Sequence, residues 1–233
     1  MTDITFSHFQ NETIEFYRQL EHNNNREWFE AHKQDYLEYV QKPSLAFITA
    51  MGERLKEISS NIVYDTRTNG AGSLMRIYRD IRFSPDKTPY KTNLGIVFWE
   101  GEGKKSENPG FYFHVTPYGI GFFSGMYGFN KQMLNAYRAA VIDETLGIEL
   151  VEVINNIQSS GYETGGEHYK RVPRNFDPDH RRADLLKYNT LYASITDLNP
   201  ELMTQPEFMD VAFGHWKNMA PLHRWLVKVA SNL

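Results

Sequence analysis

The sequence predicts an α+β fold, and three observations support this. Helical periodicity dominates the first 60 residues and returns after residue 130, whereas alternating segments lie between residues 94 and 126. Of the 233 residues, 41% are hydrophobic, which is enough to build a packed core without disulfides or metal ions. No internal repeat or domain boundary interrupts the pattern. We therefore expect one domain, residues 1–233, with a central, mainly antiparallel sheet flanked by N-terminal and C-terminal helices.

Three helices are expected at the N-terminus. Asn11 can cap a helix through Leu20, and Asn25 can cap a helix from Arg26 to Gln41, because an asparagine side chain accepts a bond from a free first-turn N–H. Pro43 is expected to interrupt the chain before a third, amphipathic helix that starts at residue 44. Four neighbouring ring-bearing residues are expected to pack these helices together: Trp28, Phe29, His32 and Tyr36.

The middle of the chain predicts an antiparallel meander. Strands are expected at residues 94–99, 111–116 and 120–126, separated by a polar loop and by the turn at 117–119. An additional strand is expected at residues 74–83, where apolar residues alternate and are expected to face the core: Met75, Ile77, Ile81 and Phe83. Arg79 falls on the same face, so it is expected to be buried and paired with a carboxylate or with backbone carbonyls.

After residue 130 the chain returns mainly to helix. Helices are expected at residues 131–143, where Asn130 is the cap, at 145–159, at 182–187, and from Pro206 to the end. A strand is expected at residues 190–196. In the last helix one apolar stripe faces the core, and Pro221 is expected to produce a kink. Residues 163–180 are expected to form mostly loop, with Gly165-Gly166 as a turn and a short strand at 169–172.

Composition and charge limit the possible functions. The absence of cysteine excludes disulfides, thiol nucleophiles and Cys-ligated metal sites. A net charge of −4 and a pI near 6.1 disfavour a surface that binds nucleic acid or anionic membrane over its whole extent. The first residues lack the features of a secretory signal, and no apolar run approaches 18 residues. We therefore expect a cytoplasmic protein without a membrane partner.

Residues 79–92, RDIRFSPDKTPYKT, carry a family resemblance. This segment resembles the bacterial and fungal family catalogued as domain of unknown function 2461. The agreement extends to Asn24-Asn25 with Trp28-Phe29, to Phe111-Tyr112-Phe113-His114, and to Arg171-Val172-Pro173 with Asp179-His180. The resemblance covers nearly the whole chain and implies one intracellular domain. It implies no reaction, cofactor or catalytic residue, so the cofactor and any enzymatic activity stay open.

The same segment suggests an anion site. Residues 76–91 contain five basic residues against two acidic ones, although the whole chain is acidic. Guanidinium and ammonium groups suit the oxygens of phosphate or carboxylate, so a small molecule bearing such a group is the expected ligand. The candidate ligand-binding residues are Arg79, Arg82, Lys87, Tyr90 and Lys91. The alternative is structural, with Arg79 paired to a buried carboxylate and the prolines only fixing a loop.

His114 and Asp80 are the candidate catalytic residues. Alternation places His114 on the same strand face as Tyr112, and the predicted sheet would place it on the face of Arg82. Histidine exchanges protons near neutral pH, so beside an arginine-lined cleft it can act as general acid or base. The alternative is a structural histidine.

The polar stretch from His168 to Arg182 is also basic and is a candidate for the opposite wall of the cleft. It contains Lys170, Arg171, Arg174, Arg181 and Arg182. Its His and Asp side chains match no recognised metal spacing, so no metal site is predicted. Two other functions stay open. One is a nucleic-acid-binding module that stacks bases on Tyr78, Tyr90 or Tyr112, and the other is a partner-binding domain without enzymatic activity.

Overall fold

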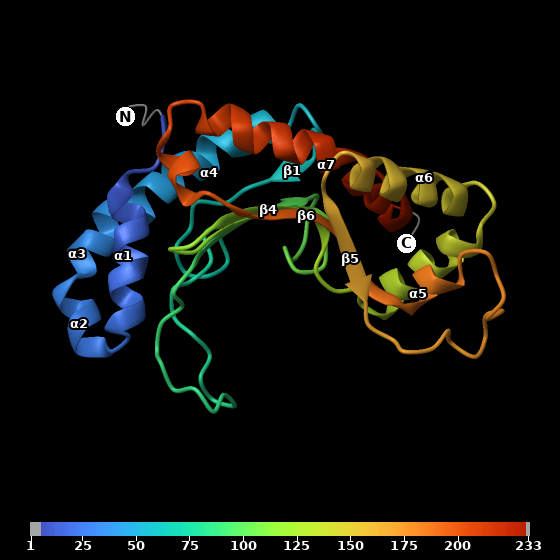
Figure 1. Cartoon of the computed structure of the whole chain (residues 1–233), viewed down its shortest axis with the longest axis horizontal. Coiled ribbons are helices and arrows are strands. Elements are labelled where there is room, and N and C mark those ends of the chain that lie inside the picture. Colours follow the sequence, from blue (N-terminus) through green and yellow to red (C-terminus); the bar gives the residue numbers. More distant parts are fainter. Residues whose placement is uncertain (1–5, 232–233) are drawn as a thin grey trace. The chain divides into compact units, whose positions relative to one another are not determined.

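The computed structural model describes residues 6–231 (Figure 1). These residues fall into two compact units. The first unit contains the described residues up to Phe98, together with Tyr112–Phe122 and Thr196–Gly214. The second unit contains Trp99–Phe111, Phe123–Ile195 and the residues from His215 onward.

A six-stranded antiparallel sheet has the order β1-β2-β3-β4-β6-β5. Its strands are β1 (Ile62–Val63), β2 (Leu94–Glu100), β3 (Gly110–Val115), β4 (Ile120–Met126), β5 (Glu163–Glu167) and β6 (Tyr188–Leu198). The adjacency of β2, β3 and β4 confirms the predicted meander. In β3, Phe111, Phe113 and Val115 are fully buried while Tyr112 and His114 are half-buried, as alternation requires. The predicted α+β class is confirmed.

The helices of the first unit are α1 (Asn11–His22), α2 (Arg26–Ala31), α3 (Lys33–Asp35), the π-helical turn η1 (Tyr36–Gln41) and α4 (Lys42–Leu55). Asn25 caps α2 as predicted, since its side chain accepts a bond from the Trp28 N–H at 2.9 Å. The prediction for Asn11 was wrong, because Gln10 takes the N-cap position. The prediction for Pro43 was also wrong: Pro43 does not interrupt the helical backbone, because η1 continues directly into α4 and Pro43 lies in the first turn of α4.

Aromatic contacts join these helices, as the sequence predicts. The ring of Phe16 in α1 lies 5.7 Å from the rings of both Trp28 and Tyr36. His32 stacks on Trp28, with 4.1 Å between the ring centroids. Phe29 is buried and stacks on Tyr90 at 4.2 Å. The short N-terminal helices therefore form a packed platform beside the segment that contains Tyr90.

In the second unit, α5 (Lys131–Ile142) and α6 (Leu146–Ser159) agree with the predicted helices, and Asn130 caps α5. The 3₁₀ turn η2 (Ala183–Lys187) also matches its predicted position, and η3 (Pro200–Thr204) adds a further turn in the first unit. The last helix, α7 (Phe208–Ala230), contains Pro221 and is divided between the units at Gly214. Its predicted apolar stripe is buried except at His215, which is half-buried.

The predictions for residues 163–172 were wrong. The strand lies at β5 instead of residues 169–172, and Gly165-Gly166 belongs to this strand instead of a turn. The pairing of β5 with β6 shifts register between Gly165 and Glu167, which indicates a bulge. Gly166 has a φ of +136°, and an added Cβ would lie 2.0 Å from the Thr190 carbonyl oxygen. A strand that needs glycine for close backbone approach lacks the apolar alternation that sequence analysis recognises.

Within residues 6–231, no helix combines the length and apolar character needed to cross a lipid bilayer.

Candidate functional site

Residues 74–83 do not form the predicted strand. Leu74 and Tyr78 make only isolated bridges, to Ile96 and Tyr90 respectively. The chain turns back on itself instead, because the Arg79 N–H donates to the Pro89 carbonyl at 2.9 Å and the Lys91 N–H to the Ile77 carbonyl at 2.7 Å. We call residues 76–91 the arm.

The predicted core face of this segment was therefore wrong. Ile77 is buried, but Phe83 is 92% exposed and Met75 is 38% exposed. The predicted placement of His114 and Arg82 on one sheet face was wrong for the same reason, since Arg82 lies outside the sheet. The alternation of apolar residues here comes from a folded-back loop and not from a strand.

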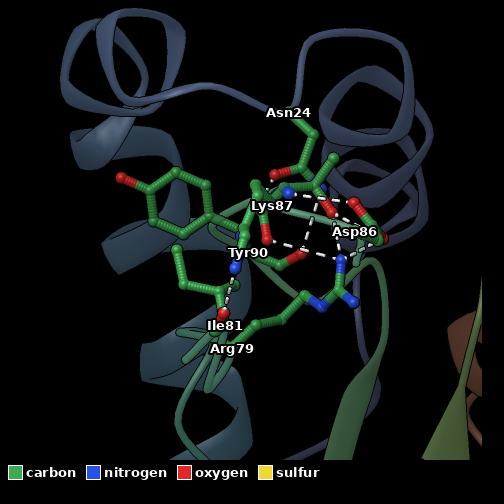
Figure 2. A network of polar contacts seen from close by, with 7 residues as sticks. Asn24, Arg79, Ile81, Asp86, Lys87 and Tyr90 are labelled. Carbon is green, nitrogen blue, oxygen red and sulfur yellow. Dashed lines mark hydrogen bonds and ion pairs between the residues drawn. The ribbon is translucent and has the colours of Figure 1, made fainter. Parts of the chain in front are cut away.

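Arg79 holds the arm closed (Figure 2). Its Nη1 donates to the carboxylate of Asp86 and to the hydroxyl of Thr88. The pairing with a carboxylate matches the prediction. The Arg79 side chain is 27% exposed, and the Asp86 side chain is more exposed than that. The pairing is local, across a turn of seven residues, and does not involve a carboxylate from the core.

The carboxylate of Asp86 is strongly stabilised in its ionised form. Hydrogen bonds from the Thr88 N–H, from Arg79 and from the Thr88 hydroxyl lower the pKa of Asp86 to about 2. An acid with this pKa is ionised throughout the neutral range, so Asp86 acts as a fixed negative group.

Asn24 fixes the other side of the arm. Its side chain accepts a bond from the Tyr90 N–H at 3.1 Å and donates to the Tyr90 carbonyl at 3.0 Å (Figure 2). The amide thereby satisfies both polar backbone groups of a buried residue. Because Asn24 lies between α1 and α2, this pairing ties the arm to the N-terminal helices.

The far end of the arm is exposed and internally paired. Arg82 donates to Asp80 through Nε at 2.9 Å and Nη2 at 2.7 Å, and Lys87 donates to the Ile81 carbonyl at 3.0 Å. The bonds from Arg82 lower the pKa of Asp80 to about 2. Such a carboxylate is a weak base at neutral pH, and Arg82 and Lys87 already use donors to shape the loop.

A hollow of about 390 Å³ lies between the arm and the end of α1. It brings together three of the predicted ligand-binding residues, Arg79, Tyr90 and Lys91. Its other lining residues are Glu21, Asn24, Asp86, Thr88, Thr92 and Asn93. Arg82, Lys87, Asp80 and His114 do not line it. Sequence analysis missed Glu21 and Asn93, which carry no recognisable spacing, and noted Asn24 only through the family resemblance.

Lys91 is the cation in this hollow without a carboxylate partner. It is half-buried and, among the described residues, forms no ion pair. Burial lowers the pKa of Lys91, and the nearby charge of Arg76 lowers it further. Arg76 also forms no ion pair within residues 6–231. Two cations therefore lie near each other, and one of them, Lys91, is partly removed from water.

His114 lies apart from the hollow, on β3. Its Nδ1 is 3.1 Å from the hydroxyl of Tyr112, and burial lowers the pKa of His114. The Tyr112 hydroxyl lies over Gly95 in β2, where an added Cβ would approach it to 2.7 Å. His114 is therefore a largely neutral histidine bonded to a tyrosine, and its catalytic role stays a prediction.

The comparisons with known proteins agree with the sequence resemblance. The profile of the family described as conserved hypothetical protein DUF2461 matches residues 12–225. The chain belongs to this family. No curated protein matches the chain. The DUF2461 match includes the whole arm and every residue that lines the hollow, so the hollow lies within the family domain.

The second basic segment of this DUF2461 member belongs to the second unit. Arg182, predicted as a cleft residue, is buried and donates to three carbonyls at the end of α5, those of Val141, Ile142 and Asp143. Arg181 pairs with Glu144, whereas three residues are exposed: Lys170, Arg171 and Arg174. In the described part of the chain, no group of three or more His, Asp or Glu side chains is placed to hold a metal ion.

Proposed function

We propose that this protein binds a small molecule carrying a phosphate or carboxylate group in the hollow beside the arm. The observation that carries the proposal is the half-buried Lys91 ammonium, which lies near Arg76 without a carboxylate partner in the described residues. Removing a charge from water costs free energy, and a neighbouring like charge adds to that cost. An anion in contact with Lys91 would offset both contributions.

Arg79 can add a second contact. Its bonds to Asp86 and Thr88 use Nη1, whereas a guanidinium has five N–H donors on three nitrogens. Glu21 and Asp86 also line the hollow, so its charge is mixed. The proposal therefore places the anionic group of the ligand between Lys91 and Arg79, and its other polar groups toward the acidic side.

We keep fewer ligand-binding residues in the proposal than the sequence suggests. Arg82 and Lys87 serve the shape of the arm, through Asp80 and the Ile81 carbonyl. Tyr90 lines the hollow, but it is only 3% exposed and its ring stacks on Phe29, so its contribution is to the packing of the site. The cationic contacts that we retain for the ligand are Lys91, Arg79 and the neighbouring Arg76.

The alternative functions have less support from the same residues. Of the three tyrosines considered for base stacking, Tyr90 is buried and Tyr112 is bonded to His114, which leaves Tyr78 at 52% exposure. A partner-binding role would rest on Phe83 at the end of the arm. The proposal keeps the cytoplasmic location expected from the sequence.

Ligand-induced thermal stabilisation tests the proposal. Wild type, Lys91→Met and Lys87→Met are compared with phosphate, pyrophosphate and a panel of mono- and dicarboxylates. A charge-assisted contact contributes about 1.5–3 kcal/mol, so Lys91→Met should weaken binding about tenfold to hundredfold. Lys87→Met, the matched control on the same arm, should bind as wild type does. Equal binding by wild type and Lys91→Met, or no stabilisation of wild type by any anion, would contradict the proposal.

A further inference from the structure

The Lys91 amine is placed to react as well as to bind. We propose that Lys91 is a nucleophile that forms a Schiff base with a small carbonyl compound whose carboxylate or phosphate is held in the same hollow. This inference rests on the proposed function, because the anionic group is what positions the carbonyl. It adds a reaction and a substrate class, namely 2-oxo acids and anionic aldehydes.

Lys91 differs from other lysines of the first unit in its surroundings. Lys33, Lys42 and Lys56 pair with glutamates one helical turn away. Lys87 donates to a backbone carbonyl. In each of these pairs the lysine nitrogen already donates to an acceptor. Lys91 has no carboxylate partner among the described residues and lines a hollow open to small molecules.

Two independent features activate the amine. Partial burial disfavours the charged form of Lys91, and the adjacent Arg76 disfavours it further, so its pKa is lowered. Desolvation and a neighbouring cation are the two means by which proteins generate neutral lysine nucleophiles near pH 7. Arg79 is fixed by Asp86 and Thr88 and lines the same hollow, so its remaining donors can hold the anionic group while the carbonyl meets Lys91.

The reaction is a condensation that needs no oxidant or reductant. The neutral amine adds to the carbonyl carbon, a C–N bond forms, and the carbonyl electron pair takes up a proton from nitrogen through solvent to give a carbinolamine. A further proton from solvent then protonates the carbinolamine hydroxyl, the C–O bond breaks, one water leaves, and the nitrogen electron pair forms the C=N bond of a protonated imine. Asp86 lines the hollow but, with a pKa of about 2, stays ionised near neutral pH, so the protons are exchanged with solvent. The imine keeps the positive charge that pairs with the ligand.

Reductive trapping tests this inference. Wild type is treated at pH 7 with glyoxylate and cyanoborohydride, and the modification of each lysine is measured by peptide mass spectrometry. Lys91 should be modified at least tenfold faster than Lys87. Its rate should also reach a plateau at lower pH than the rates of the other lysines. Lys91→Arg keeps the charge and should remove the fast-reacting site, while Lys87→Arg should not.

A neutral aldehyde separates the two proposals. If glycolaldehyde labels Lys91 as selectively as glyoxylate does, the nucleophile is supported and the anion site is contradicted. If glyoxylate stabilises wild type but labels Lys91 no faster than Lys87, the nucleophile is overturned and the anion site stands. If glyoxylate neither stabilises wild type nor labels Lys91 selectively, both are overturned. Selective labelling of Lys91 by glyoxylate alone supports both.

Discussion

Single side chains decide how the arm is held, and the most informative is Asn24. The Tyr90 backbone has no strand partner beyond one isolated bridge, so its polar groups need a side chain. Asn24 supplies a donor and an acceptor at once. Arg79 illustrates the opposite outcome, because its predicted carboxylate partner exists but lies seven residues away on the same loop. The carboxylate partner of Arg79 was therefore predicted, whereas its predicted position on the core face of a strand was wrong.

Replacing Asn24 should loosen the arm. Asn24→Leu removes both bonds to a buried backbone, and each is worth about 0.5–1.5 kcal/mol, so we expect about 1–3 kcal/mol of destabilisation in urea unfolding. Asn24→Asp keeps the acceptor for the Tyr90 N–H, so its loss of stability should be about half that of Asn24→Leu. Asn23→Leu is the matched control, because Asn23 is exposed and donates only to the Gln19 carbonyl. Equal effects at the two positions would show that the pairing with Tyr90 does not hold the arm.

The Asp86 carboxylate predicts a pH dependence. Its pKa falls from 3.8 to about 2 on folding, so the ionised form is favoured in the folded state. The stabilisation is complete above pH 4 and is lost as the pH falls toward 2. Wild type should therefore be more stable than Asp86→Asn at pH 6, and the difference should shrink between pH 4 and pH 2. A difference that stays constant over this range would mean that the bonds to Asp86 do not depend on its charge.

At the scale of elements, the end of α5 shows how a charged residue can be structural. Arg182 donates to three carbonyls that have no partner inside the helix, so a buried cation closes a helix C-terminus. Gly147 in α6 permits this contact, since an added Cβ would lie 2.2 Å from the Val141 oxygen and 2.5 Å from the Arg182 Nε. The partners lie about forty residues apart in sequence, so no local pattern predicts them.

Two glycine substitutions should have opposite effects. Gly147→Ala forces the Arg182 cap apart, and we expect about 1–3 kcal/mol of destabilisation. Gly214→Ala in α7 places its Cβ in open space, so it should stabilise by about 0.5–1 kcal/mol through helix propensity. Thermal unfolding of both variants checks this. Destabilisation by both substitutions would show that helix position, and not the contact with Arg182, determines the effect.

Some helices and strands were predicted correctly from the sequence and others were not. The meander, α5, α6 and α7 were predicted because an apolar period of 2 or 3.6 reflects burial on one face. The arm and β5 were not, because one is a loop held by side-chain bonds and the other depends on glycine at a bulge. For the site, the sequence correctly predicted that Arg79, Tyr90 and Lys91 lie together at the hollow. Arg82 and Lys87 were also predicted there, but they bond to Asp80 and to the Ile81 carbonyl, and these bonds depend on how the loop folds back.

At the scale of the whole molecule, the chain connects its two units many times. Each of β2, β3, β4 and β6 is divided between them within its own length, and α7 is divided at Gly214. A strand that loses its pairing in one unit loses the register that continues into the other. Two compact units do not therefore imply two domains, since a domain boundary is expected where few connections cross.

This division predicts one cooperative unfolding transition. Because four strands belong to both units, we expect the calorimetric and van't Hoff enthalpies to agree, as they do for single domains. Asn24→Leu, in the first unit, and Gly147→Ala, in the second, should each move the single transition as a whole. Trp28 and Trp225 report on separate units, so fluorescence from variants that keep only one of them should give coincident curves in wild type and in both mutants. Two transitions, each shifted by only one mutation, would show that the units unfold independently and that the chain contains two domains.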